Sequence, residues 1–185
     1  MDAGLFSFHL DPALTLTAAC TVAGIMIASA IPKLRDLASF EEVVVEYRIL
    51  PEGLARLVGR ALPWLELLAA VGLVYPMTSL LSAQVLALLV AGFGCAIAVN
   101  LLRGRTRIDC GCGVTEGSTE LNWLMLGRNA FLLILLAISA GTGTGRALIL
   151  MDAWMVVTGS ASLIGLYMTA DYLLANLPRI NQLRS

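Results

Sequence analysis

The sequence predicts an all-α membrane protein: a polytopic bundle of four core transmembrane helices, a fifth span and a short interfacial amphipathic helix. Three observations predict this class. Hydrophobic residues make up 58% of the 185 residues and charged residues 14%, whereas soluble domains carry roughly a quarter charged residues. The apolar residues gather in blocks of about 20, the length that crosses a bilayer as a helix. These blocks are continuous rather than alternating, and continuous apolar blocks favour helices over barrel strands.

Five such blocks predict the spans of a single integral membrane domain. The break inside the long second run is the stretch YPMTS at 75–79, where proline and polar residues favour a turn. The glycine-rich stretch GTGTG at 141–145 separates the last two blocks. The expected spans cover approximately residues 13–31, 61–75, 82–102, 121–140 and 148–174.

The segment 36–49 differs from these blocks, because its apolar residues recur at steps of three and four. The apolar positions are Leu37, Phe40, Val44 and Tyr47, and charged residues occupy the other faces. This pattern predicts a short amphipathic helix at the membrane surface. A cap packed under the bundle is the alternative for the same pattern.

The basic residues predict the orientation. With five spans, eleven of the twelve Lys and Arg residues fall on one side and only Arg146 on the other. Since basic loops stay in the cytoplasm, we expect an outside N-terminus and a cytoplasmic C-terminus. The N-terminus lacks a positively charged region, so no cleaved signal peptide is expected. The net charge of −1 gives no electrostatic footprint for nucleic acid.

The candidate catalytic residues are Cys110 and Cys112, in the stretch DCGCG of the most polar loop. Gly111 lets the backbone bend so that the two thiols can meet. The resulting ring would be small and strained, and strained, exposed disulfides exchange readily. Arginines just upstream favour the reactive thiolate, whereas Asp109 opposes it. The pair is thus a candidate for electron exchange with another protein or with a membrane quinone; no other cofactor is expected.

Two other interpretations of the cysteine pair stay open, half of a metal site and a loop of inert thiols. A structural zinc site needs about four Cys or His ligands, and the sole histidine, His9, is expected on the opposite side of the membrane. We therefore expect no metal site within one chain, although two chains sharing a site is an alternative. Cys20 and Cys95 lie in apolar spans and are expected to be small hydrophobic side chains.

Ionisable residues at membrane depth usually face the bundle interior and have a partner. Glu66 and Arg128 are expected at similar depths of the second and fourth spans, so we predict an ion pair between them, which Lys33 can join. Such a cluster either fixes the packing of the helices or moves protons during thiol exchange. The supporting polar residues of the predicted site are Lys33, Glu66, Asn100, Arg103, Asp109, Arg128 and Asn129.

An ordered set of short motifs between residues 13 and 140 carries a family resemblance. The motifs are PKLRD at 32–36, Phe40, YRILP at 47–51, LPWLE at 62–66, NLLRGR at 100–105, DCGCG at 109–113 and LNWLMLGRN at 121–129. On these motifs the chain resembles the MauE family of methylamine-utilisation membrane proteins, which is related to DoxX-like four-helix membrane proteins. One departure concerns the second cysteine: the family usually continues with an aromatic residue and a glycine, whereas Gly113 and Val114 follow here.

The resemblance implies an accessory role in the inner membrane of a bacterium. Proteins of the MauE family are thought to help process, export or mature the small subunit of methylamine dehydrogenase, a periplasmic redox enzyme with several disulfides. They also occur beside thioredoxin-like partners, which implies a more general thiol relay. The rival hypothesis is a non-catalytic membrane scaffold or chaperone that holds such a partner. A small-solute transporter is a weaker rival, because the chain shows no inverted repeats of equal size.

Overall fold

The computed structural model describes residues 9–105, 121–143 and 146–182, and this part of the chain is almost entirely helical. The helices are α1 (Pro12–Arg35), α2 (Leu37–Glu46), α3 (Glu52–Val74), α4 (Ser79–Leu102), α5 (Trp123–Ser139) and α6 (Leu150–Gln182). Two residues, β1 (His9–Leu10), pair in parallel with β2 (Thr142–Gly143). The predicted all-α membrane class is confirmed.

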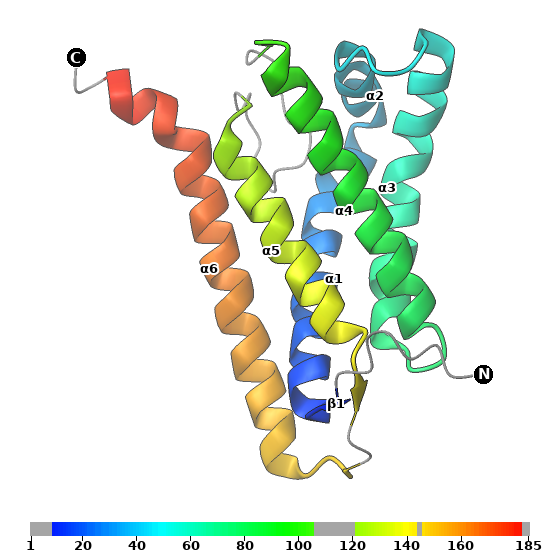
Figure 1. Ribbon diagram of the computed structural model, residues 1–185, viewed down its shortest axis with the longest axis vertical. Coiled ribbons are helices and arrows are strands. Elements are labelled where there is room, and N and C mark those ends of the chain that lie inside the picture. Colours follow the sequence, from blue (N-terminus) through cyan, green and yellow to red (C-terminus); the bar gives the residue numbers. More distant parts are fainter. Residues whose placement is uncertain (1–8, 106–120, 144–145, 183–185) are drawn as a thin grey trace.

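The five long helices alternate in direction, as Figure 1 shows. Helix α1 lies at the centre and packs against α3, α5 and α6, while α4 packs against α3 and α5. The short helix α2, the last turn of α4 and the end of α6 lie at one end of the bundle, and the β1–β2 pair lies near the other. We call these the α2 end and the β1 end.

Within the described residues, four helical segments are long and apolar enough to cross a membrane: Pro12–Arg35, Glu52–Val74, Ser79–Leu102 and Leu150–Leu174. Helix α5 is also apolar but has 17 residues, or about 26 Å at 1.5 Å per residue, near the lower limit for a span. Many outward side chains on these helices are large and apolar, such as Leu68, Leu88 and Trp154. The chain is therefore a multi-pass membrane protein.

Helix α1 can lie at the centre of the bundle because many of the side chains on its surface are small. Its buried residues include five alanines, together with Val22 and Ile25, which are both fully buried. Small residues let helix backbones approach closely in a membrane. The approach to α6 is tightest at Gly24, where an added Cβ would lie 2.6 Å from Cδ1 of Ile164.

The helix ends follow from acidic caps and prolines. Asp11 precedes Pro12, and its Oδ1 accepts a hydrogen bond from the Ala13 N–H, which caps α1. Asp36 ends α1 and also caps α2, accepting from the Ser39 N–H at 3.0 Å. Helix α3 begins directly after Pro51, earlier than the span expected from residue 61, because its first turns carry charged residues on an exposed face.

The amphipathic helix expected over 36–49 is α2, and it packs against α3. Phe40 and Glu41 are its buried residues, and Glu41 Oε1 accepts from Arg60 Nε of α3 at 2.7 Å. At Gly59 of α3 an added Cβ would lie only 3.1 Å from the Glu41 Cα, so the two backbones almost touch. This contact fits the packed-cap alternative.

Candidate functional site

A buried ion pair joins α1 to α3 near the α2 end. Lys33 Nζ donates to Glu66 Oε2 at 2.7 Å, and the two side chains are 6% and 5% exposed. The same ammonium lies 5.4 Å from the ring centre of Phe40 and 5.2 Å from that of Phe93. One carboxylate and two aromatic faces therefore compensate the charge of the buried lysine.

A second buried ion pair joins α5 to α6. The Arg128 guanidinium donates to the Asp171 carboxylate, and both side chains are buried. The Tyr167 ring, one turn before Asp171, lies 5.7 Å from the guanidinium carbon. This pair holds the last helix to the bundle at a point where α6 is otherwise mostly exposed.

These two pairs correct the predicted ion pair between Glu66 and Arg128. The partner of Glu66 is Lys33, and the partner of Arg128 is Asp171. The similar depths expected of Glu66 and Arg128 did not fix their partners, because central α1 packs against both α3 and α5 and presents Lys33 to Glu66. Asp171 was not predicted as a partner from the sequence, although an acidic residue in an apolar helix is itself the signal of a buried partner.

A small cavity lies beside the Lys33–Glu66 ion pair. Its volume is about 20 Å³, room for about one water molecule. Its polar lining residues are Ser29, Lys33, Glu66, Asn129 and Tyr167. Asn129 Nδ2 is buried with no hydrogen-bond acceptor among the described residues. Lys33, Glu66 and Asn129 thus line one polar cavity, and the guanidinium of Arg128 lies beside it, over the ring of the lining residue Tyr167.

Asn100 lies elsewhere, at the junction of α4 with the loop that follows α2. Its fully buried amide Nδ2 donates to the backbone carbonyl oxygens of Tyr47 and Ala96 at 3.2 and 3.1 Å. Its Oδ1 accepts from Arg105 Nη1 at 3.3 Å, and Arg103 Nη1 donates to the Arg48 carbonyl at 3.4 Å. Asn100 and Arg103 therefore fix the backbone near the end of α4 and do not line the small cavity.

The predicted catalytic residues Cys110 and Cys112, together with Asp109, lie outside the described residues. The described chain flanks them on both sides at the α2 end. Before them, Arg103 and Arg105 make the hydrogen bonds given above. After them, Leu121 is buried in a cluster with Tyr47, Ile97 and Met125.

The other two cysteines are free thiols in helices. Cys20 of α1 is half-buried and Cys95 of α4 is exposed on the outer surface. No group of three or more metal-ligating side chains occurs within 9–105, 121–143 and 146–182.

A larger cavity of about 290 Å³ lies between α2, the loop after it, α3 and α4. All of its lining residues are apolar or aromatic, and Phe40 and Phe93 separate it from the Lys33 ammonium. Among the described residues this is the space large enough for the ring of a quinone or a lipid chain.

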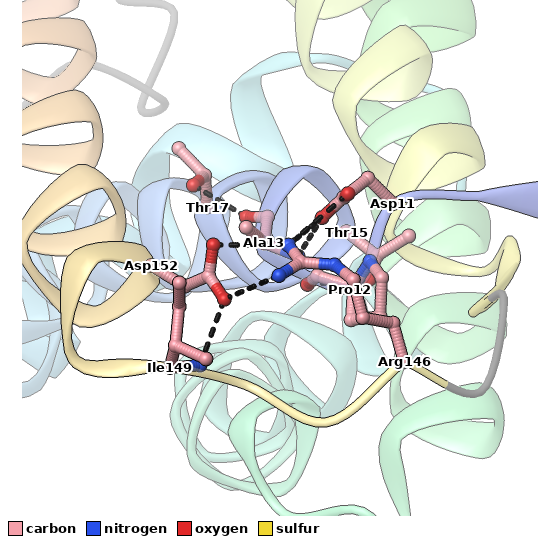
Figure 2. Close-up of polar contacts among 8 residues, drawn as sticks. All are labelled: Asp11, Pro12, Ala13, Thr15, Thr17, Arg146, Ile149 and Asp152. Carbon is pink, nitrogen blue, oxygen red and sulfur yellow. Dashed lines mark hydrogen bonds and ion pairs between the residues drawn. The ribbon is translucent and has the colours of Figure 1, made fainter.

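Figure 2 shows a polar cluster at the β1 end that was not predicted from the sequence. Arg146 Nη2 lies 3.0 Å from Asp11 Oδ1 and 2.9 Å from Asp152 Oδ1, so the arginine bridges the first turns of α1 and α6. Hydrogen bonds from Arg146 and from the Ala13 N–H hold the pKa of the Asp11 carboxyl below its usual value. Asp152 and then Asp11 raise the pKa of Arg146. The sequence does indicate this cluster. Arg146 is the one basic residue expected on that side of the membrane, and the acidic residues Asp11 and Asp152 lie near the starts of the first and last spans.

The family model and the relatives that match this chain all carry the same family description. The model of the family described as methylamine utilisation protein MauE matches residues 11–142. A methylamine utilization protein MauE of Methylorubrum extorquens is 45% identical over 120 residues, covering 65% of this chain and 64% of the relative. The protein of that name from Methylophilus methylotrophus is 47% identical over 55% of this chain and 54% of its own length.

A third relative matches along almost the whole chain. The methylamine utilization protein MauE of Paracoccus denitrificans is 34% identical over 167 residues, 90% of each chain. The matches to the first two relatives cover less than two thirds of their length. No solved structure matches this chain.

Proposed function

We propose that this chain, which belongs to the MauE family of methylamine-utilisation membrane proteins, matures a secreted redox-enzyme subunit by dithiol–disulfide exchange at Cys110 and Cys112. The family assignment places the chain in the context of methylamine utilisation. By that context the client is a periplasmic subunit that resembles the small subunit of methylamine dehydrogenase. The basic residues instead predict a cytoplasmic cysteine pair, so direct exchange with this client requires that one apolar block does not cross the membrane or that the cysteine segment reaches into the bundle. Thiol labelling from each side of the membrane distinguishes the two orientations.

One structural observation carries the proposal: both flanks of the cysteine segment are fixed to the bundle at the α2 end. Arg103 and Arg105 are hydrogen-bonded on one side, and Leu121 is buried on the other. Reactive residues usually lie in segments whose two ends are held by a rigid frame, because the frame limits the range of positions of the segment. The buried polar centre of Lys33 and Glu66 lies near the same end.

The proposed reaction conserves atoms and electrons. A client thiolate attacks one sulfur of the Cys110–Cys112 disulfide and forms a mixed disulfide, which releases the other sulfur as a thiolate. A second client thiolate then resolves the mixed disulfide. The client gains one disulfide and loses two electrons and two protons, and the pair becomes a dithiol. A thioredoxin-like protein in its disulfide form, or a membrane quinone, takes up the two electrons to restore the pair.

The buried polar centre has two alternative roles in this scheme. In the first, the Lys33–Glu66 pair fixes the packing of α1 on α3. In the second, Glu66 and the Asn129 amide form a polar floor that moves protons during thiol exchange. Replacing Glu66 with Gln keeps the shape and removes the charge. A normal protein level with lost thiol exchange would support the proton role, and loss of the protein would support packing.

Serine at both Cys110 and Cys112 tests the proposed function directly. We expect the client subunit to accumulate with free thiols, measured by alkylation and mass shift of the subunit in cells. Alanine at both Cys20 and Cys95 is the matched control and should leave client disulfides unchanged. Normal client maturation in the serine variant would reject thiol exchange and leave the non-catalytic scaffold.

A trapped complex would identify the partner. With Cys20 and Cys95 replaced by alanine, Cys110→Ser leaves Cys112 alone, and Cys112→Ser leaves Cys110 alone. We expect one of these variants to accumulate a mixed disulfide, because the resolving thiol is absent. Mass spectrometry of the attached protein would distinguish a client subunit from a thioredoxin-like partner.

A further inference from the structure

We propose that the cavity between α2, α3 and α4 is a specific site for an anionic phospholipid, with one acyl chain in the cavity and the head-group phosphate on Arg48 and Arg103. This inference goes beyond the proposed function and does not depend on the cysteine pair. It rests on the walls of the cavity, on its rim and on the charges beside the rim.

The walls match hydrocarbon. Val43, Val58, Leu62 and Leu89 are among the lining residues, and polar side chains are absent from the lining apart from the Tyr47 phenol. The volume of about 290 Å³ is too large to stay empty at native packing density without a substantial loss of contacts. An apolar chain restores these contacts.

The rim of the cavity is formed by its exposed lining residues Ile49, Leu50 and Leu88. Leu88 belongs to α4, a helix apolar enough to span the membrane, so the rim opens toward the bilayer. Leu88 on the rim is 74% exposed, and Ile49 and Leu50 are 46% and 40% exposed. A lipid chain can therefore enter the cavity sideways from the bilayer without any helix moving.

Two arginines stand beside the rim at the α2 end. Arg48 lies between the lining residues Tyr47 and Ile49, and Arg103 Nη1 donates to the Arg48 carbonyl at 3.4 Å. Both side chains are exposed. The ion pairs recorded between described residues include neither of them, whereas Arg56 and Arg60 pair with Glu52 and Glu41. Two neighbouring cations without a carboxylate favour an anion between them.

The backbone at Arg48 adds a second reason. Arg48 has a φ of 49°, and within the described residues it is the one residue other than glycine with a positive φ. This conformation favours glycine or asparagine, so a long arginine here carries backbone strain. This backbone conformation holds the cationic side chain of Arg48 where the cavity meets the expected head-group region.

An anionic phospholipid fits both halves of the site. Basic residues between transmembrane helices at the membrane surface are the usual contacts of anionic head groups. A zwitterionic lipid offers the same phosphate together with a cation that the two guanidinium groups repel. A neutral quinone would leave both arginines without an anion. The bound lipid would tie the loop after α2 to the end of α4, where the chain enters the cysteine segment.

Lipid binding to the purified full-length protein in detergent tests the proposal. Phosphatidylglycerol and phosphatidylcholine with identical acyl chains are compared by native mass spectrometry. We expect phosphatidylglycerol to bind on the order of twenty-five-fold more tightly, about fivefold for each of the two arginines. Arg48→Gln and Arg103→Gln should each remove about fivefold of this preference. Arg35→Gln is the matched control, since Arg35 is exposed, belongs to none of the recorded ion pairs and does not line the cavity.

A second variant tests the cavity itself. Gly92 lines the cavity, and a Cβ added there meets no atom within 4 Å, so Gly92→Leu fills the space without a clash at the backbone. We expect this variant to lose binding of phosphatidylglycerol while it stays helical and monodisperse. Gly165→Leu is the control, because Gly165 is also exposed with open space around it, but on α6.

The following results would overturn the proposal: equal binding of the two lipids, unchanged binding in Gly92→Leu, or displacement of the lipid by a neutral quinone with no dependence on the arginines. The measurement is repeated with serine at Cys110 and Cys112. Lipid binding should persist there, so failure of thiol exchange and failure of the lipid site remain distinguishable.

Discussion

Lys33 of α1 and Glu66 of α3 form a salt bridge of 2.7 Å in which both side chains are almost completely buried. The lysine is additionally flanked by the rings of Phe40 and Phe93. The pair therefore joins the two helices most firmly when both charges are present.

Removing one member of this pair should be much more harmful than removing both. Lys33→Met or Glu66→Leu leaves an uncompensated buried charge, at a cost of about 3–5 kcal/mol. The double variant Lys33→Met with Glu66→Leu should recover most of this loss, because no charge remains buried. Thermal unfolding in detergent of the two single variants and the double variant measures the coupling. Additive losses in the double variant would show that the two side chains act independently.

The contact between α2 and α3 predicts opposite effects for two glycines of one helix. Gly59→Ala places a Cβ 3.1 Å from the Glu41 backbone and should destabilise the protein by about 1–3 kcal/mol relative to Gly53→Ala. Gly53 has open space around it, so alanine there should be neutral or stabilising. Thermal unfolding of the two variants side by side is the measurement. Equal stability would mean that α2 is not held closely against α3.

The arginine bridge at the β1 end predicts sensitivity to acid. The folded-state pKa of Asp11 is depressed by Arg146 and by the Ala13 N–H. Its contribution to stability is thus present above the unfolded pKa of about 3.9 and is lost as the pH falls through the depressed folded value. Arg146 stays protonated throughout this range. Asp11→Asn should remove this part of the acid dependence, measured as unfolding temperature between pH 7 and pH 3. An unchanged acid profile in Asp11→Asn would contradict the assignment.

The orientation inferred from the basic residues predicts the side on which Cys112 reacts. With Cys20 and Cys95 replaced by alanine and Cys110 by serine, a membrane-impermeant thiol reagent should label Cys112 in inverted vesicles and not in intact cells. A single cysteine introduced at the exposed Met77, in the turn at the opposite end of α3, is the matched control and should label in intact cells. Labelling of Cys112 in intact cells would reverse the proposed topology and would place the cysteine pair on the side of a periplasmic client.

Much of the fold could be predicted from the sequence, and the reasons are local. A block such as 82–102 has no charge, so a membrane helix is its favourable state whatever its neighbours are. The end of α1 is likewise marked in the sequence by Lys33, Arg35 and Asp36. The start of α3 was less predictable, because charged residues from Glu52 onward continue the helix on an exposed face.

The candidate site was predictable only in part. Lys33, Glu66, Arg128 and Asn129 were identified because a polar group inside an apolar helix is costly without a partner. The roles of Asn100 and Arg103 at the end of α4 were not, since their hydrogen bonds go to backbone carbonyl groups of a distant loop. Every residue has a backbone carbonyl group, so residue identity does not show which carbonyl accepts a hydrogen bond, and such contacts cannot be predicted from the sequence.

The sequence by itself determined that the chain crosses the membrane several times as helices and that Lys33, Glu66 and Arg128 need buried partners, because both follow from the cost of placing polar groups in hydrocarbon. Only the tertiary structure decided which charge meets which. The partners of Glu66 and Arg128 depend on the central place of α1 and on the way α6 returns along the bundle, and these follow from small residues such as Gly24 and Ala23, whose packing carries no charge or period. The depth of a charged residue in the membrane follows from its position in the sequence, whereas its partner depends on how the helices pack in the bundle.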